Sequence, residues 1–142
     1  MFRKTVVLMA LLAGSAMAAD DMRQLAKLPP QAEANLREEM RTSLLQLNEV
    51  IGLVVAGKVK EAGELAEKEL GLSAMGKNRA LPIEARPGAN MPTAMHLIGM
   101  DGHKEASAFA AIAATGDREK TLAALPKLPT PCIACHYSYR IR

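Results

Sequence analysis

The sequence CIACHYSYR, residues 132–140, lies at the C-terminal end of the 142-residue chain and contains its only two cysteines. Cys132 and Cys135 are three positions apart, and His136 follows Cys132 by four positions. On an α-helix, residues three or four positions apart lie on the same side, about one turn from each other. The spacing therefore predicts that both thiols and the imidazole project from one side of a single helical turn.

The C-x-x-C-H spacing is the attachment sequence of a c-type haem. Each thiol can add to one vinyl group of the porphyrin to form a thioether, and the imidazole of His136 can bind the iron as the proximal ligand. A structural zinc site needs four ligands, and the only other histidines are His96 and His103. A thiol redox pair usually accompanies alternating strands and helices, which the sequence does not show. We therefore expect one covalently bound haem c.

The N-terminal end of the chain has the composition of a secretory signal peptide. It combines a basic start at Arg3 and Lys4, an apolar stretch at residues 5–13 and small residues around a cleavage site. We expect residues 1–18 to be removed, which leaves residues 19–142 as one small domain in the periplasm. The apolar stretch is shorter than the about 20 residues that span a bilayer. A retained membrane anchor is the alternative.

The composition argues against nucleic acid as a partner. Loss of residues 1–18 lowers the 18 basic side chains by two, against 15 acidic ones, so the mature chain is nearly neutral. Aromatic residues make up 3% of the chain and provide no platform for stacking bases. No nucleophile–base pair or pair of neighbouring carboxylates stands out, so we expect no enzyme site apart from the haem.

Apolar residues at three- and four-residue steps predict four helices and no strands. The expected helices span residues 30–56, 59–70, 92–114 and, with an interruption, 118–140. The Gly57-Lys58 connection makes the first two helices an antiparallel hairpin, and residues 72–91 form a long crossing loop. We therefore expect an all-α fold, a four-helix bundle of two antiparallel hairpins with the haem attached to the C-terminal helix.

Three prolines interrupt the fourth helix. Pro126, Pro129 and Pro131 break the helical pattern that begins at residue 118. Thr130 can cap the restarted helix, with Pro131 at its first helical position.

The residues 132–140 match the pattern C-x-x-C-H-x-x-Y/F-R at each defined position and resemble the class II cytochromes c, the cytochrome c′ family and its low-spin relatives. The C-terminal place of the motif, the helix count and the long crossing loop agree with that family. The resemblance implies a periplasmic monohaem cytochrome, and some members are homodimers that associate through their first two helices. The chain departs from the family at the three prolines, because the family has the motif on a long fourth helix.

The resemblance implies two functions, which differ in the sixth ligand of the iron. Members with a methionine on the first helix are six-coordinate, low-spin electron carriers, and members with an apolar residue there are five-coordinate and bind NO and CO. Met40, on the apolar stripe of the first helix, has a place similar to the ligand methionine. Arg37 resembles the arginine that meets a haem propionate. His103, which shares one side of the third helix with His96 and Met100, is the alternative ligand.

Two residues beyond the motif complete the predicted haem site. Arg140 follows His136 by one helical turn and can reach the haem edge, where the family's arginine shields the proximal face. We expect Tyr139 to pack against the porphyrin or the first helix. The sequence thus predicts a carrier of single electrons that meets redox partner proteins in the periplasm. Binding of NO or CO, and a haem-free helical module with a Cys132–Cys135 thiol pair, are the alternatives.

Overall fold

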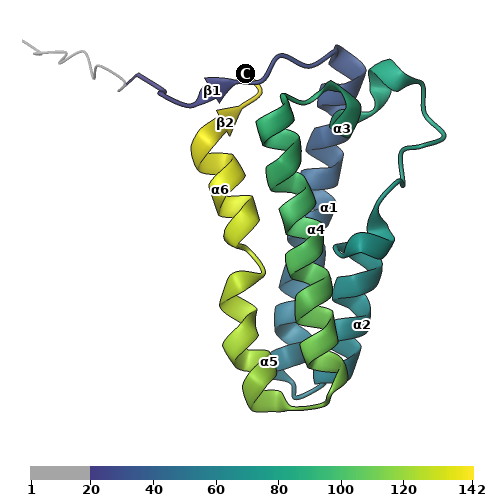
Figure 1. The fold of residues 1–142 in the computed structure, drawn as a ribbon, viewed down its shortest axis with the longest axis vertical. Coiled ribbons are helices and arrows are strands. Elements are labelled where there is room, and N and C mark those ends of the chain that lie inside the picture. Colours follow the sequence, from purple (N-terminus) through teal and green to yellow (C-terminus); the bar gives the residue numbers. More distant parts are fainter. Residues whose placement is uncertain (1–19) are drawn as a thin grey trace, which may run out of the picture.

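Residues 20–142, which the computed structural model describes, form a mostly helical chain with one pair of very short strands (Figure 1). The signal peptide predicted for residues 1–18 lies outside the described residues. The all-α prediction is confirmed, and the prediction of no strands is wrong for this one pair. In chain order, the elements are β1 (Gln24–Leu25), α1 (Pro30–Val55), α2 (Val59–Glu69), α3 (Pro87–Asn90), α4 (Thr93–Ala114), α5 (Arg118–Ala124), α6 (Thr130–Ser138) and β2 (Tyr139–Arg140), with 3-10 turns at Leu72–Ala74, Ile83–Ala85 and Leu125–Lys127.

The helices α1 and α2 are joined by the tight turn that the sequence predicts. Pro30 begins α1, where its missing N–H leaves no helical hydrogen bond unmade. After α1, Gly57 has a φ of 77°, in the left-handed region that glycine adopts without strain. The chain then returns along α1 as α2 (Figure 1). The predicted ends of both helices agree with the structure to within one residue.

The helices α2 and α4 approach each other closely at Gly63. A Cβ built on Gly63 would lie 2.8 Å from the Cβ of Ala113 and 3.1 Å from the carbonyl oxygen of Ala110. Only glycine leaves room for this approach. The segment between α2 and α4 holds two 3-10 turns and the short α3, and it covers one end of the helices (Figure 1). The predicted third helix is confirmed as α4, and the segment predicted as a loop contains a short helix and two 3-10 turns that were not predicted.

The fourth helix is divided, as the prolines predict, into α5, a 3-10 turn and α6. Asp117 caps α5, because its carboxylate accepts a hydrogen bond from the backbone N–H of Lys120 at 3.0 Å. The predicted cap at Thr130 is wrong. Pro129 already has helical angles, with φ of −80° and ψ of −8°. Thr130 therefore lies inside the helix, and its hydroxyl donates to the carbonyl oxygen of Pro126 at 3.3 Å.

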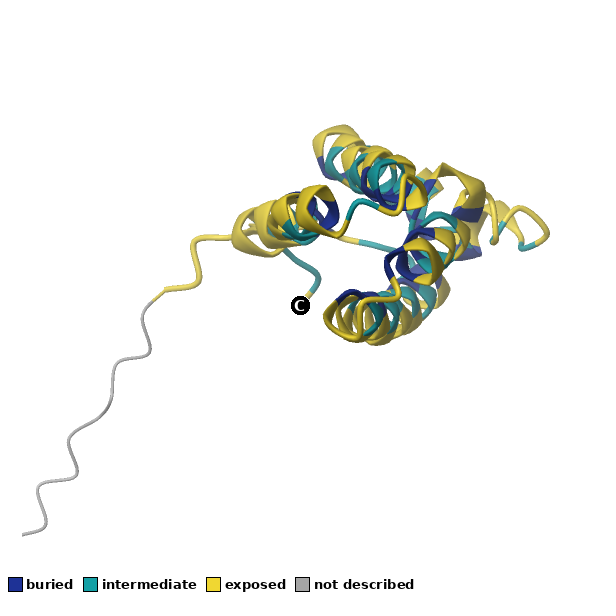
Figure 2. Ribbon diagram, turned by 90° about the horizontal axis from the view of Figure 1, so that it is seen from below, coloured by how far each residue is buried: buried dark blue, intermediate teal, exposed yellow. Residues whose placement is uncertain are grey.

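Most of the buried apolar residues of the described chain belong to two clusters. Figure 2 shows buried stretches on the sides of the helices that face one another. The large cluster consists of Val50, Val54, Ala62, Ala66, Ala106, Phe109, Ala113, Ala124 and Leu128. The small cluster consists of Ala26, Leu36 and Met95, with Leu28, Met91, Cys135, Tyr139 and Ile141 packed against them. A domain usually has one contiguous core with smaller satellite clusters, and the small cluster is a satellite of this kind.

No helix among residues 20–142 combines the length and the apolar composition that crossing a membrane requires.

Candidate functional site

The C-x-x-C-H residues all lie in α6. Cys132 and His136 are exposed, and Cys135 is half-buried against the small cluster. Both cysteines carry free thiols. The prediction that the motif occupies one helical turn is therefore confirmed, and the turn directs one thiol toward the core.

The acidity of the two thiols bears on the alternative of a thiol redox pair. Desolvation raises the pKa of Cys132, and it also raises the pKa of Cys135, to which the charge of a Cys132 thiolate adds. Redox-active C-x-x-C pairs have a thiol with a lowered pKa, because the thiolate is the reacting form. The surroundings of this pair do not favour thiol–disulfide chemistry.

On α1, the apolar stripe is uncovered between the two clusters. Leu36 belongs to the small cluster and Val50 to the large one. Between them, Met40 is 41% exposed and Leu44 is 68% exposed. Ile51 at 38% and Val55 at 68% are exposed as well, so the apolar stripe of α1 is not buried along its whole length.

On α4, the inward face is interrupted at Gly99. Met95 belongs to the small cluster and Ala106 to the large one. Gly99 is four residues after Met95 and seven before Ala106, so helical periodicity puts it on the same side. Yet Gly99 is exposed, and a Cβ built on it meets no atom within 4 Å. The inward side of α4 therefore opens onto free space at this level.

On α6, the same division falls at the predicted attachment site. Leu128 belongs to the large cluster, Cys135 packs against the small one, and the exposed Cys132 lies between them. Met40 and Leu44 on α1, Gly99 on α4 and Cys132 on α6 are thus exposed between residues of the two clusters, and we call this region the core break.

The residues at the core break fit a c-type haem. Two thiols can form the thioethers, an imidazole and a thioether sulfur are common axial ligands, and apolar side chains suit a flat apolar ring. Among residues 20–142 no cluster of three or more His, Cys, Asp or Glu side chains could hold a metal ion. A haem iron does not require such a cluster, because the porphyrin supplies its four equatorial nitrogens.

His103 lies on the α2 side of α4. Its Nδ1 is 2.7 Å from the carbonyl oxygen of Leu70 and 3.0 Å from that of Gly71, so the N–H at Nδ1 donates to the end of α2. Gly102, the preceding residue, faces α6, because a Cβ there would contact Pro131 at 3.6 Å. Successive helical residues point about 100° apart. The imidazole of His103 thus links α4 to the end of α2 through this hydrogen bond.

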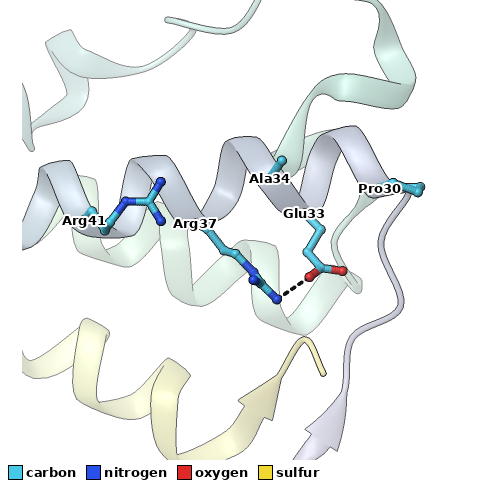
Figure 3. A pocket seen from close by; sticks show the side chains of 5 residues that line it. All are labelled: Pro30, Glu33, Ala34, Arg37 and Arg41. Atoms are coloured by element: carbon cyan, nitrogen blue, oxygen red, sulfur yellow. Dashed lines mark hydrogen bonds and ion pairs between the residues drawn. The ribbon is translucent and has the colours of Figure 1, made fainter.

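Arg37 lines an open concavity of about 320 Å³ on α1, together with Pro30, Glu33, Ala34 and Arg41 (Figure 3). Its guanidinium donates to the carboxylate of Glu33 at 2.5 Å, and both side chains are about one-third exposed. Arg37 follows Leu36, which packs in the small cluster with Cys135. Arg37 is thus one residue from a member of the small cluster, and its guanidinium is paired with Glu33.

The chain after the motif differs from the prediction. α6 ends at Ser138, and Tyr139 is extended, with φ of −128° and ψ of 149°. Arg140 is therefore in β2 and not one helical turn after His136. Tyr139 packs against the small cluster, which contains Leu36 of the first helix. The Nε atom of Arg140 is buried without a hydrogen-bond partner and lies 3.7 Å from Oδ2 of Asp21.

Sequence reasoning missed the segment before α1. Ala26 is fully buried and Leu28 half-buried in the small cluster beside Cys135. The parallel pairing of β1 with β2 joins this segment to the chain that follows the motif. The apolar residues Leu25, Ala26 and Leu28 just before Pro29 were the available signal, although they do not reveal which distant strand they meet.

Comparison with known proteins gives no match: no protein-family model, no curated protein and no solved structure matches the chain. The function has to be inferred from the site itself.

Proposed function

We propose that this protein is a periplasmic monohaem c-type cytochrome that carries single electrons between redox partner proteins. Cys132 and Cys135 hold the haem through thioethers, and His136 binds its iron. The helices α1, α2, α4 and the divided α5–α6 form a four-helix bundle of two antiparallel hairpins around it. The proposal adds two features to the helical fold described above, which are the bundle arrangement of the helices and the bound haem.

One observation carries this proposal. The exposed Cys132 of the C-x-x-C-H motif and the exposed Met40 and Leu44 of α1 all lie between residues of the two clusters. A haem attached to Cys132 and Cys135 at this level covers the exposed apolar side chains of Met40 and Leu44. Apolar burial stabilises by about 25 cal/mol per Å² of covered surface, so an uncovered stripe between two clusters favours an apolar occupant.

The bound haem supplies the one-electron redox change of its iron. The residues of the chain determine how easily that change occurs. Met40 provides the sulfur of a sixth ligand, and methionine–histidine ligation raises the reduction potential. Leu36 and Met95 limit the access of water from the side of the small cluster. Arg37 places a positive charge near the predicted position of a propionate.

Binding of NO or CO to a five-coordinate iron is the second candidate function. It is favoured by the exposure of Met40, since a methionine that is not packed in place leaves the sixth position open to a small gas. His103 is a weaker candidate for the sixth ligand than Met40, because breaking its two contacts with the end of α2 would precede any binding to the iron.

Mass spectrometry of the denatured protein tests the proposal. The full chain, including residues 1–18, is expressed in a bacterium with a haem c maturation system and purified from the periplasm. We expect the mass of residues 19–142 plus one haem, and we expect the unmodified mass for the variant with both Cys132→Ser and Cys135→Ser. A colourless wild-type protein whose two thiols react with an alkylating agent would refute haem attachment.

Optical and EPR spectra of the same sample separate the two functions. A low-spin ferric signal with the methionine-to-iron charge-transfer band supports the electron carrier. A high-spin ferric signal, with a ferrous form that takes up CO without losing a ligand, supports the gas-binding protein.

A further inference from the structure

The N-terminal segment of the described chain is joined to the chain that follows the motif. β1 pairs in parallel with β2, with Gln24 opposite Tyr139 and Leu25 opposite Arg140. The backbone N–H of Ala26 donates to the carbonyl oxygen of Arg140 at 2.8 Å. Figure 1 shows this two-stranded pair at the end of α6. The last turn of α6 is therefore held by a segment more than one hundred residues earlier in the sequence.

Apolar packing anchors the same segment beside the attachment cysteine. Ala26 is fully buried, and Leu28 packs with Cys135 and Tyr139 in the small cluster. The strand pairing aligns the segment with β2, and this packing holds Ala26 and Leu28 against the small cluster. Residues 21–28, which we call the clasp, thus contact α6 and β2 by both backbone and side chain.

Arg23 connects the clasp to His136 itself. Its Nε and one terminal nitrogen donate to the two carboxylate oxygens of Asp21 at 2.9 and 2.7 Å. Its other terminal nitrogen donates to the carbonyl oxygen of His136 at 3.5 Å. The last carbonyls of a helix have no partner within the helix, and a cation near them is stabilising. Arg23 therefore interacts with the free end of the turn that carries His136.

Asp21 holds this guanidinium in place. Its hydrogen bonds with Arg23 lower the pKa of the Asp21 carboxyl to about 2. The carboxylate stays charged throughout the physiological pH range. Its Oδ2 also lies 3.7 Å from the buried Nε of Arg140. The Asp21 carboxylate thus lies near both Arg23, which contacts His136, and Arg140, which follows the motif in the sequence.

We propose that the clasp, residues 21–28, positions the haem-bearing turn of α6, and that Arg23 is the positioning residue for His136. This inference rests on the proposed function. Exposed ion pairs contribute little to the global free energy of unfolding. The effect of Arg23 is therefore local, on the orientation and mobility of residues 136–140.

Hydrogen exchange and EPR of the haem-loaded Arg23→Ala protein test the clasp. We expect the backbone amides of residues 136–140 to exchange about fivefold faster, because the end of α6 opens more often without this contact. We expect the ferric EPR signal to broaden or split, because His136 adopts more than one orientation. Arg23→Lys keeps the charge but loses the two-point contact with Asp21, so it should restore part of the wild-type signal.

The control is Arg118→Ala, an exposed arginine at the start of α5, at the opposite end of the molecule from β1 (Figure 1). It should leave both measurements unchanged. If Arg23→Ala retains the haem mass and shows both wild-type exchange rates and a wild-type EPR signal, the positioning role of the clasp is refuted. Absence of the haem mass in the wild-type protein would instead overturn the proposed function, and the role of Arg23 toward an iron ligand with it.

Discussion

The two candidate sixth ligands have different surroundings at the scale of single residues. His103 is engaged by the carbonyl oxygens of Leu70 and Gly71, and its bond joins α4 to α2. Met40 makes no comparable polar contact and is 41% exposed beside the core break. A thioether sulfur is a poor hydrogen-bond acceptor, so it can turn toward an iron without breaking a polar interaction. Met40 is therefore the residue to change first.

Met40→Ala should convert a six-coordinate, low-spin iron into a five-coordinate, high-spin one. The reason is that alanine has no atom able to bind the iron. The measurements are the methionine-to-iron charge-transfer band, which should disappear, and the ferric EPR spectrum. Met75→Ala, at a methionine of the crossing loop that is 36% exposed, is the control. An unchanged spectrum in Met40→Ala would assign the sixth position to another residue or to none.

Gly99→Leu should stabilise the haem-free chain and hinder haem attachment. Leucine favours helix over glycine by roughly 1 kcal/mol, and its side chain enters the free space on the inward side of α4. Thermal unfolding is measured in a protein that also carries Cys132→Ser and Cys135→Ser, where we expect Gly99→Leu to raise the Tm. The haem-loaded fraction is measured in a protein with both cysteines intact, where we expect Gly99→Leu to lower that fraction.

Gly52→Leu is the matched control for this prediction. Gly52 also has no atom within 4 Å of a built Cβ, but it lies on the outward side of α1, among exposed residues. It should leave the haem-loaded fraction unchanged. If Gly99→Leu also binds a full complement of haem, the space beside Gly99 is not where the porphyrin lies.

At the scale of elements, α2 and α4 depend on close packing at Gly63. Gly63→Ala gains helix propensity, but its Cβ would lie 2.8 Å from the Cβ of Ala113 and close to a backbone oxygen of α4 that cannot move away. Overpacking of this kind costs about 1–3 kcal/mol. We expect a lower Tm by thermal unfolding, whereas Gly52→Ala should raise it slightly. An increase in Tm for Gly63→Ala would show that the two helices can separate without loss.

The crossing loop is fastened to α2 and α4 by Glu67. Its carboxylate accepts hydrogen bonds from the hydroxyls of Ser107 and Ser73 and from the backbone N–H of Ser73 at 3.0 Å. The hydroxyl of Ser107 in turn accepts the N–H of Leu72 at 2.9 Å. These hydrogen bonds lower the pKa of Glu67, with that of Ser107 contributing most.

Glu67→Gln should therefore reduce stability in a pH-dependent way. A carboxyl whose pKa is lower in the folded state stabilises the fold above its unfolded pKa of about 4.3. That stabilisation is lost as the pH falls through the folded pKa. Urea unfolding should show a deficit of about 1 kcal/mol at pH 7 that shrinks on acidification below pH 4. Glu64→Gln, at an exposed residue of the same helix, is the control. A deficit that is independent of pH would exclude the charge as its cause.

At the scale of the whole molecule, the division of the core predicts a strong dependence of stability on the haem. The variant with Cys132→Ser and Cys135→Ser should keep its helices but lose on the order of 3 kcal/mol in the free energy of unfolding. Complete burial of one side chain such as Met or Leu is worth about 1.5–3 kcal/mol, and Met40 and Leu44 both lie uncovered at the core break. Circular dichroism measures the helix content, and urea unfolding measures the stability. Equal stabilities of the coloured and colourless proteins would contradict a haem seated at the core break.

The helix ends could be predicted because each depends on nearby residues. Pro30, Gly57 and Asp117 act on their own turn, through a fixed φ, a left-handed backbone and a side-chain cap. The wrong prediction of a cap at Thr130 has a local cause as well. Three prolines lie within six residues, and the helical angles of Pro129 start the helix at Thr130, one residue earlier than the pattern of Thr130 followed by Pro131 predicts. The haem attachment, the ligands and the periplasmic location remain predictions that rest on the motif and on residues 1–18.

The helical segments, and the place of two thiols and an imidazole on one turn, follow from the residue order alone, because helical hydrogen bonds and spacing join residues at most four apart. The pairing of β1 with β2, the bond from His103 to α2 and the separation of Leu36, Met95 and Cys135 from the large cluster follow from the folded arrangement instead. Those features join segments from opposite ends of the chain, such as Arg23 and His136. No local pattern encodes them, since each depends on how the helices pack against one another.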